Sequence, residues 1–417
     1  MTKPAWHASE ANAQPAPARP PVPRPLIVLG FGLMAVSFMI NAMDRQVFYP
    51  LLPEIAATYN FSLSEGGLLA TGFTLGIAVA GIPAGYLVDR WSRRTVLILS
   101  IVIYSVGTLV TPLATAFGDL AVYRLISGCG EGMQAAALYA AISSFFLVRR
   151  SLALGALGVA FGAGVFFGPL IGTGLATSYG SWRAPFVFFG LLGLAIAAVM
   201  TFSLHKGLTE GTASGAGEVV AECEHLPDTP YNRNTILLAV ASAAGGLVFY
   251  GFLGLYPTYL RETLHFSVGQ GALATSLVGA GAAMSLPSGW LGDRFDQRKV
   301  LLVTFAGVSV SGLLLFAGPH TTQWQFVCAF LMGTFAAGSM FTNCNSMMQR
   351  SVRPRHVGRA AGLFVASYYS AASVSGFVFA RLVTTLGWQH AALWQLTVLP
   401  AVVLVPVWFL DSKRTAP

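Results

Sequence analysis

The chain has 417 residues, of which 55% are hydrophobic and 10% are charged. Soluble proteins carry about 25% charged residues, and a soluble fold so poor in charge could not cover its surface. The composition therefore excludes soluble, disordered and fibrous proteins and predicts an integral membrane protein in a lipid bilayer. The net charge of +8 indicates positively charged cytoplasmic loops, and we expect no nucleic-acid partner.

The chain begins with a polar, proline-rich segment. This segment has no short apolar stretch followed by a cleavage site, so we do not expect it to be a signal peptide. We predict a disordered cytoplasmic tail over residues 1–25. The first apolar run then stays in the protein as a membrane span.

Twelve apolar runs follow, and each is long enough to cross a bilayer as a helix of about 20 residues. They lie near 26–48, 66–88, 95–117, 119–147, 152–178, 184–204, 234–260, 268–292, 299–318, 323–348, 357–384 and 390–410. An even number of spans places both termini on one side. Of the 24 Lys and Arg, 19 lie on that side, Arg183, Arg261 and Arg381 lie opposite, and Arg45 and Arg124 lie within apolar runs. This asymmetry predicts cytoplasmic termini and a location in the inner or plasma membrane.

One long polar loop, residues 205–233, divides the spans into six and six. We interpret it as a cytoplasmic linker between two domains. The predicted domains are an N-terminal bundle over 26–204 and a C-terminal bundle over 234–410, with a cytoplasmic tail at 411–417.

A repeated motif supports this division. The first copy contains Gly85, Asp89, Arg90, Arg93 and Arg94, and the second contains Gly289, Asp293, Arg294 and Arg298, with the glycines and aspartates 204 positions apart. Each copy lies between the second and third span of its half. Matched motifs in two six-span halves indicate a duplicated transporter.

The pattern G-x-L-x-D-R-x-x-R-R/K in both copies resembles the signature loop of the major facilitator superfamily, and the resemblance covers about residues 25–411. Ser92 and Asp296 stand where the family usually has glycine. The resemblance implies an all-α membrane fold of twelve transmembrane helices, in two six-helix bundles related by pseudo-two-fold symmetry. The motif would act as a conformational latch, because its aspartate can cap a helix N-terminus and its arginines can bind helix C-termini and carboxylates. The alternative is positive-inside charge alone.

The fourth span carries charges at membrane depth. Arg124, Gly128 and Glu131 share one helix face and are similar to the fourth-helix pattern R-x-x-x-G-x-G of the superfamily. A charge inside the membrane is costly and indicates function. The alternative is that Arg124 and Glu131 only pair and hold helices together.

The first span ends with Asp44-Arg45, followed by a Leu-Pro-x-Ile segment. This resembles the organic-anion/cation symporter branch and also the spinster-type lipid transporters. The resemblance implies that Asp44, Arg45, Arg124 and Glu131 lie together in the N-terminal half. Alternatively, Asp44 and Arg45 form an interfacial pair at the outer helix end.

The fifth span contains Gly155, Gly164, Gly168, Pro169 and Gly172. They match the pattern g-x8-G-x3-G-P-x2-G-G at all but the last position, and in the superfamily this pattern is associated with proton-driven exporters. Small residues at this spacing also let helices pack closely, and a proline bends a span. Generic helix packing is therefore the alternative.

The C-terminal half lacks the corresponding charges. The positions 204 residues after Asp44, Arg124 and Glu131 hold Val248, Cys328 and Phe335. We predict that the N-terminal half binds the proton and the charge of the substrate, and that the C-terminal half supplies shape and neutral hydrogen bonds. The candidate substrate-binding residues are Arg45, Arg124, Gln134, Tyr250, Tyr256, Asn343, Asn345, Tyr368 and Tyr369.

These residues suggest proton coupling. Glu131 or Asp44 would pair with Arg124 in the empty protein, and protonation would release Arg124 to hold an anionic substrate. We therefore predict a proton-coupled symporter of a small organic anion, such as a carboxylate, that works by alternating access. The alternative is a proton-driven exporter of drugs or amphipathic lipids.

A membrane enzyme or sensor is the third possibility. No nucleophile motif, phosphate loop or metal-ligand spacing supports it, and the four cysteines form no CxxC pattern. We therefore expect no enzyme activity, no metal and no cofactor beyond the proton as coupling ion. Sodium as the coupling ion is the alternative, and no cluster of intramembrane acids and unwound carbonyls in the sequence favours it. We expect a monomer.

Overall fold

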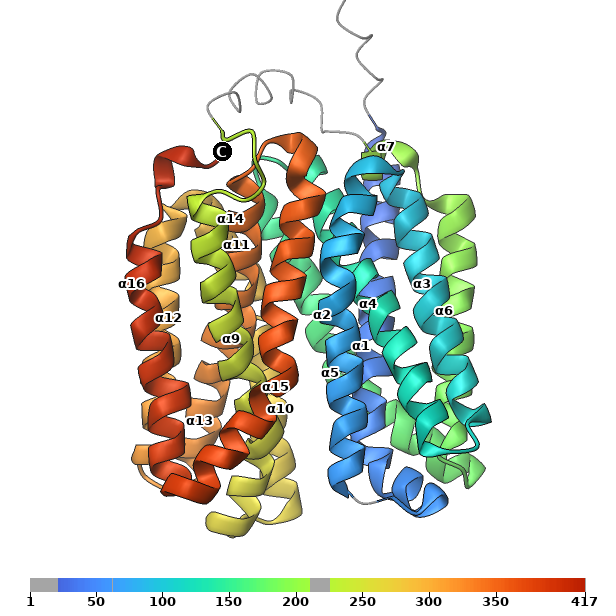
Figure 1. Cartoon of the computed structure of the whole chain (residues 1–417), viewed down its shortest axis with the longest axis vertical. Helices are drawn as coiled ribbons and strands as arrows, with labels where there is room; N and C mark the ends of the chain where they lie inside the picture. Colours follow the sequence, from blue (N-terminus) through green and yellow to red (C-terminus); the bar gives the residue numbers. More distant parts are fainter. Residues whose placement is uncertain (1–21, 62, 211–225, 417) are drawn as a thin grey trace, which may run out of the picture.

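The computed structural model describes residues 22–61, 63–210 and 226–416, and every regular element in these ranges is a helix. Figure 1 shows two groups of long helices standing side by side, the N-terminal group in blue to green and the C-terminal group in yellow to red. Helices suit an apolar chain in lipid because each backbone N–H and C=O finds its partner within its own segment.

The N-terminal half consists of six long helices. They are α1 (Arg24–Tyr59), α2 (Leu63–Arg90), α3 (Arg93–Val110), α4 (Phe117–Phe145), α5 (Arg150–Tyr179) and α6 (Arg183–Ser203), with the short η2 (Thr111–Leu113) after α3. Helix α1 runs beyond the predicted end near residue 48, because Leu51 and Ile55 are buried in a cluster with Trp182 and Phe186.

The C-terminal half has more interruptions. Its helices are α9 (Arg233–Thr258), η4 (Tyr259–Thr263), α10 (Val268–Ala282), α11 (Ser285–Arg294), α12 (Gln297–Ala317), α13 (Thr322–Met332), η5 (Gly333–Met340), α14 (Phe341–Arg350), α15 (Val357–Ala392), η7 (Leu393–Val398) and α16 (Leu399–Trp408), with short 3-10 turns η6 (Pro354–His356) and η8 (Ser412–Arg414). The segments η4, η5 and η7 are π-helical and continue the α-helices before them. Such insertions in a helix are frequent at functional sites.

The helices correspond to the twelve predicted spans. In the described ranges, nine stretches are long and apolar enough to cross a membrane, and one of them, Pro354–Trp408, is 55 residues long. This stretch contains two spans, because the chain turns at Gly387, which has a φ of 77°. Helix α4 and the α10–α11 segment are the two remaining spans of the twelve. Helix α4 is not among the nine stretches, and it carries three charged residues, Asp119, Arg124 and Glu131.

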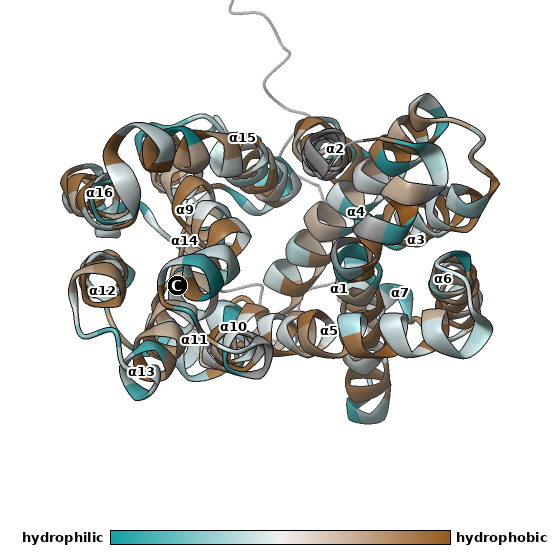
Figure 2. Ribbon diagram, turned by 90° about the horizontal axis from the view of Figure 1, so that it is seen from below, coloured by the Kyte–Doolittle hydropathy of each residue, from teal (hydrophilic) through white to brown (hydrophobic). Residues whose placement is uncertain are grey.

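The outer surface of the two halves is apolar. Figure 2 shows hydrophobic residues on outward-facing parts of the peripheral helices. Large apolar side chains are exposed there, including Phe202 on α6, Val303 on α12 and Val405 on α16. Exposure of such side chains is unfavourable in water and expected in lipid.

Part of the predicted linker is helical. Helix α7 (Lys206–Glu210) follows α6, and its residue Leu208 is fully buried. Residues 211–225 of the linker and residues 1–21 of the predicted tail lie outside the described ranges. Helix α1 already begins at Arg24.

The two halves touch through α2 against α15 and α5 against α11. Glycines allow the backbones to approach closely at both contacts. A Cβ added to Gly85 would lie 2.6 Å from the carbonyl oxygen of Gly358, and one added to Gly155 would lie 3.1 Å from the Cα of Leu286. These two contacts bring the backbones of the halves close together.

Candidate transport site

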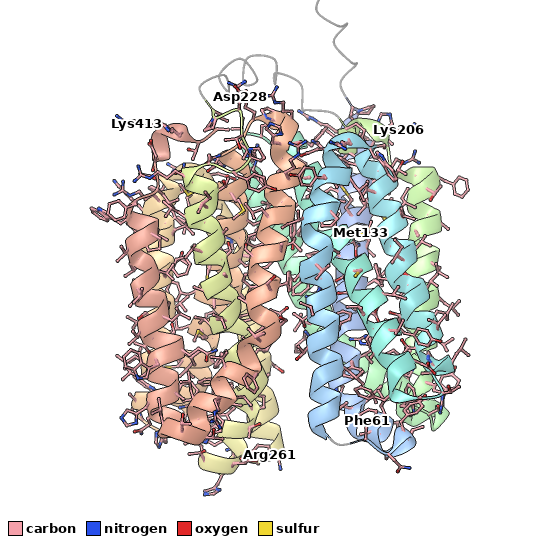
Figure 3. The ribbon with its side chains drawn as sticks, viewed as in Figure 1. Phe61, Met133, Lys206, Asp228, Arg261 and Lys413 are labelled. Atoms are coloured by element: carbon pink, nitrogen blue, oxygen red, sulfur yellow. The ribbon has the colours of Figure 1, made fainter. Side chains whose placement is uncertain are left out.

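A cavity of about 820 Å³ lies between the two halves. It reaches Arg261, which Figure 3 shows on the face of the molecule opposite to Lys206, Asp228 and Lys413. We call the face with Arg261 the open face, and the face with Lys206, Asp228 and Lys413 the linker face. Among the described residues that line the cavity, Arg261 is the one with a charged side chain.

Aromatic side chains from both halves meet at one part of the cavity wall. Tyr139 on α4 lies with its ring centroid 6.1 Å from those of Phe341 on α14 and Phe364 on α15. The ring centroid of Phe341 also lies 5.0 Å from that of Tyr368. Tyr139, Phe341 and Tyr368 line the cavity, so this cluster joins the halves there.

A buried ion pair lies in the N-terminal half. Arg45 on α1 donates from Nε to Oε2 of Glu131 on α4 at 2.9 Å, and its Nη2 lies 2.8 Å from the same oxygen. The side chains of Arg45 and Glu131 are 3% and 0% exposed. Because a buried charge without compensation is strongly unfavourable, each of these groups depends on the other.

Arg45 also reaches the C-terminal half. Its Nη1 donates to the hydroxyl oxygens of Tyr250 on α9 and Tyr369 on α15, both at 3.2 Å. The guanidinium lies 5.3 Å from the ring centroids of Phe161 and Tyr369. Since Tyr250, Tyr369 and Phe161 line the cavity, Arg45 lies directly behind the cavity wall and links the two halves.

Asp44 and Arg124 form the second part of the charged group. Thr108 donates to Oδ2 of Asp44 at 2.5 Å, and Asp44 is fully buried. Arg124 interacts electrostatically with both Asp44 and Glu131, and its guanidinium lies 4.0 Å from the ring centroid of Phe73. The structure thus brings together the four charged residues that the sequence placed in one half.

The first copy of the repeated motif connects the two halves near the linker face. Asp89, near the end of α2, accepts hydrogen bonds from the backbone N–H groups of Gly358 and Arg359 at 2.8 and 3.0 Å. These two residues lie in the first turn of α15, in the other half. Asp89 therefore caps the N-terminus of a helix across the interface, where a negative charge is favourable. Arg93 and Arg94 contact α7, where Glu210 accepts from the backbone N–H of Arg94 at 3.0 Å.

The second copy makes the corresponding contact. Asp293, near the end of α11, accepts from the backbone N–H groups of Ser151 and Leu152 at 2.9 and 2.8 Å, in the first turn of α5. Asp293 also forms an ion pair with Arg350. The two aspartates thus cap helices of opposite halves in pseudo-symmetric positions.

The remaining arginines of the motifs lie near the surface. Arg90 is exposed. Arg294 lies 5.3 Å from the ring centroid of Trp290, and Arg298 lies 4.7 Å from that of Trp408. Arginine guanidinium groups stack well on aromatic rings.

Comparison with known proteins agrees with this arrangement. The family model described as the Major Facilitator Superfamily matches residues 34–284 and 238–417. The chain belongs to the major facilitator superfamily. It is therefore a secondary transporter and a multi-pass membrane protein, and it is not an enzyme. The twelve-helix, two-bundle fold predicted from the sequence is confirmed.

Individual relatives are distant. The chain is 27% identical over 346 residues to the hexuronate transporter of Bacillus subtilis, covering 78% of this chain and 80% of the relative. It is 26% identical over 365 residues to sialin of Ovis aries, covering 79% and 72%. The crystal structure of the human organic anion transporter MFSD10 matches with a TM-score of 0.72 at 18% identity, covering 94% of this chain and 100% of that chain.

Four of the predicted substrate-binding residues of this superfamily member line the cavity, namely Tyr250, Asn345, Tyr368 and Tyr369. Gln134 lies behind Arg45 instead. Its amide accepts from Asn41 at 2.7 Å, and the Asn41 side-chain oxygen in turn accepts from Arg45 at 3.5 Å. Gln134 thus supports the position of Arg45.

The structure does not bring Tyr256 and Asn343 to the described cavity lining. The Tyr256 hydroxyl donates to the side chain of Gln325 at 3.2 Å inside the C-terminal bundle. Asn343 donates to the hydroxyl of Ser288 at 2.9 Å, also within that bundle. Both residues are polar, but the helix face that carries them packs against a neighbouring helix.

The glycines of the fifth span lie where α5 packs against other helices. A Cβ on Gly164 would lie 2.6 Å from the Cβ of Ala42, and one on Gly168 would lie 2.7 Å from the Cα of Met43, both on α1. Gly172 faces Val47 of the same helix. Pro169 lines the cavity.

Phe161, Gln46 and Arg261 line the cavity although none of them was predicted as a site residue. Arg261 offered one usable signal, because it is one of only three Lys or Arg assigned to the side opposite the termini. Phe161 lies in an apolar span without any feature that separates a cavity-facing phenylalanine from a lipid-facing one.

Proposed function

We propose that this transporter couples the movement of a proton to that of a small organic anion, such as a carboxylate. The ion pair between Arg45 and Glu131, buried behind the cavity wall, is the observation that carries the proposal. Asp44 and Arg124 lie in the same group, so two arginines balance two carboxylates. Protonation of one carboxylate leaves one positive charge, which an anion can neutralise.

The contacts of Arg45 suggest how coupling works. A proton on Glu131 removes the negative partner of Arg45, and a buried arginine without a partner is strongly unfavourable. An anion at the cavity wall beside Tyr250 and Tyr369 would restore the balance. The protonated protein therefore favours the loaded state, and the deprotonated protein favours the empty state with the ion pair intact. This assigns to Arg45 the role that the sequence suggested for Arg124.

Rocking of the two bundles, 26–204 and 234–410, would then carry the site from one face to the other. The caps formed by Asp89 and Asp293 hold the linker face closed in the present state. If the termini are cytoplasmic, as the distribution of Lys and Arg predicts, the open face is the outer one. The two motif copies would act as latches that open when the cavity closes to the outside.

Proton flux in proteoliposomes tests the proposal. The protein is reconstituted with a pH-sensitive dye inside, and mono- and dicarboxylates are added outside under a proton gradient. Carboxylates should evoke proton co-movement, and Glu131→Gln should abolish it. Glu54→Gln is the matched control, because Glu54 lies on the same helix as Arg45 and is exposed. Full proton-driven uptake by the Glu131→Gln variant would refute the coupling mechanism.

Export of drugs or amphipathic lipids is a second candidate, supported by the apolar residues that α5 presents to the cavity. In the same assay, an exporter would release protons from the vesicles in response to amphipathic compounds. It would stay silent toward small carboxylates. These opposite responses separate the two candidates.

A further inference from the structure

Helix α5 and the C-terminal half contribute different side chains to the cavity. Helix α5 lines the cavity from Leu154 to Leu170, and every α5 residue in the described lining is apolar, with Leu157, Phe161 and Val165 among them. These positions recur every three to four residues, so they form one continuous helix face about 24 Å long. This face offers a substrate no hydrogen-bonding side chain.

The C-terminal half contributes polar side chains to the cavity lining, next to apolar ones such as Phe249 and Phe341. The polar ones include Tyr250, Thr342, Asn345 and Tyr369. Two of them, Tyr250 and Tyr369, accept hydrogen bonds from Arg45 at 3.2 Å. A hydroxyl group can donate one hydrogen bond while it accepts another. Each tyrosine that accepts from Arg45 can therefore donate a hydrogen bond to a group in the cavity. An anionic group therefore fits beside these tyrosines.

We propose that the substrate is an amphipathic organic anion, with its acid group at Tyr250 and Tyr369 and a ring-sized apolar body against the α5 face. This inference rests on the proposed function and narrows its substrate class. A sugar acid carries hydroxyl groups on all sides of its ring, and those that face α5 would lose their water without gaining a partner. An apolar ring gains free energy by burial against the same face. A volume of about 820 Å³ accommodates such a molecule, since small-molecule pockets span roughly 300–1,000 Å³.

A matched pair of acids tests this inference. Cyclohexanecarboxylate and quinate share a six-membered ring and a carboxylate, and quinate carries additional hydroxyl groups. Both are added to the proteoliposomes described above, with neutral cyclohexanecarboxamide as the charge control. We expect the half-saturating concentration of cyclohexanecarboxylate to be at least about tenfold lower than that of quinate. Burying even one hydroxyl group without a hydrogen-bond partner reduces affinity by about this factor.

A variant of the apolar wall provides the second test. Val165→Thr keeps the shape of the side chain and replaces one methyl group on the α5 face with a hydroxyl group. It should lower the preference for cyclohexanecarboxylate over quinate about twofold or more. Val199→Thr is the control, because Val199 lies on α6, is 47% exposed and is not among the cavity-lining residues.

The outcomes separate this inference from the proposed function. Equal or better transport of quinate, or no response to cyclohexanecarboxylate, overturns the inference. If quinate still evokes proton co-movement that Glu131→Gln abolishes, the proposed function stands. If the amide is transported as well as the acid, anion coupling itself fails.

Discussion

Asp89 offers a direct test of how the linker face is held closed. The Asp89→Asn substitution keeps the shape of the side chain and removes its charge. In the structure both carboxylate oxygens of Asp89 accept a backbone N–H, from Gly358 at 2.8 Å and from Arg359 at 3.0 Å. An asparagine has one oxygen and one NH₂ group, so one of the two N–H groups at the start of α15 would face a donor.

The effect can be estimated from these contacts. A hydrogen bond to a charged group contributes about 1.5–3 kcal/mol, and the Asp89 side chain is only 2% exposed, so solvent screens this contribution little. The ion pair with Arg359, which is 22% exposed, adds less than about 1 kcal/mol. A loss of about 2 kcal/mol would change the equilibrium constant between the two conformations about thirtyfold, away from the conformation with the linker face closed.

Distances between spin labels measure this shift. Cysteines introduced at Tyr179, at the end of α5, and at exposed His320, after α12, would report the separation of the halves at the open face. We expect Asp89→Asn to increase the population with a short distance. Asp293→Asn should act in the same direction, because Asp293 caps α5 in the pseudo-symmetric position.

A matched control guards against a general charge effect. Asp228 is exposed at the linker face, where it pairs with Arg353 and Arg355 without capping a helix of the other half. Asp228→Asn should leave the distance distribution close to that of the unmodified protein. An unchanged distribution in Asp89→Asn, or an equal shift in Asp228→Asn, would refute the reasoning.

Three further outcomes are expected in the transport assay. Arg261→Gln should raise the half-saturating anion concentration at low salt and have little effect on it at high salt. The reason is that the exposed charge of Arg261 at the cavity mouth attracts anions over a distance at which salt screens the attraction. An equal effect at both salt concentrations would argue against this long-range attraction. Tyr369→Phe should raise the half-saturating anion concentration about threefold or more, whereas Tyr256→Phe, which lies away from the cavity, should not change it. Equal effects of the two variants would show that Tyr369 is not part of the substrate site. Gly85→Ala should slow transport about fivefold or more, because the added methyl group prevents the halves from approaching without strain. Gly254→Ala should not slow transport, because a Cβ at this position meets no atom within 4 Å. Full activity of Gly85→Ala would show that the close approach of the halves is dispensable.

Much of the architecture could be predicted because membrane insertion is encoded locally. Length and apolarity of a segment determine whether it spans a bilayer, and the repeated motif at a constant offset marks the duplication. The charged residues Asp44, Arg45, Arg124 and Glu131 were recognisable for a related reason, since a charge in an apolar span is rare. Their roles, and the cytoplasmic position of the termini, stay predictions.

The sequence by itself determined the number of spans, the division into halves and the concentration of buried charge in the first half. Only the tertiary structure decided which side chains meet: that Glu131 pairs with Arg45 of another helix, that Tyr369 reaches the cavity while Tyr256 does not, and that α5 presents an apolar face to it. The physical reason is that most spans are apolar nearly all round. Periodicity therefore does not reveal which face meets lipid, a neighbouring helix or the cavity, and the rotation of each helix is set by packing against its neighbours.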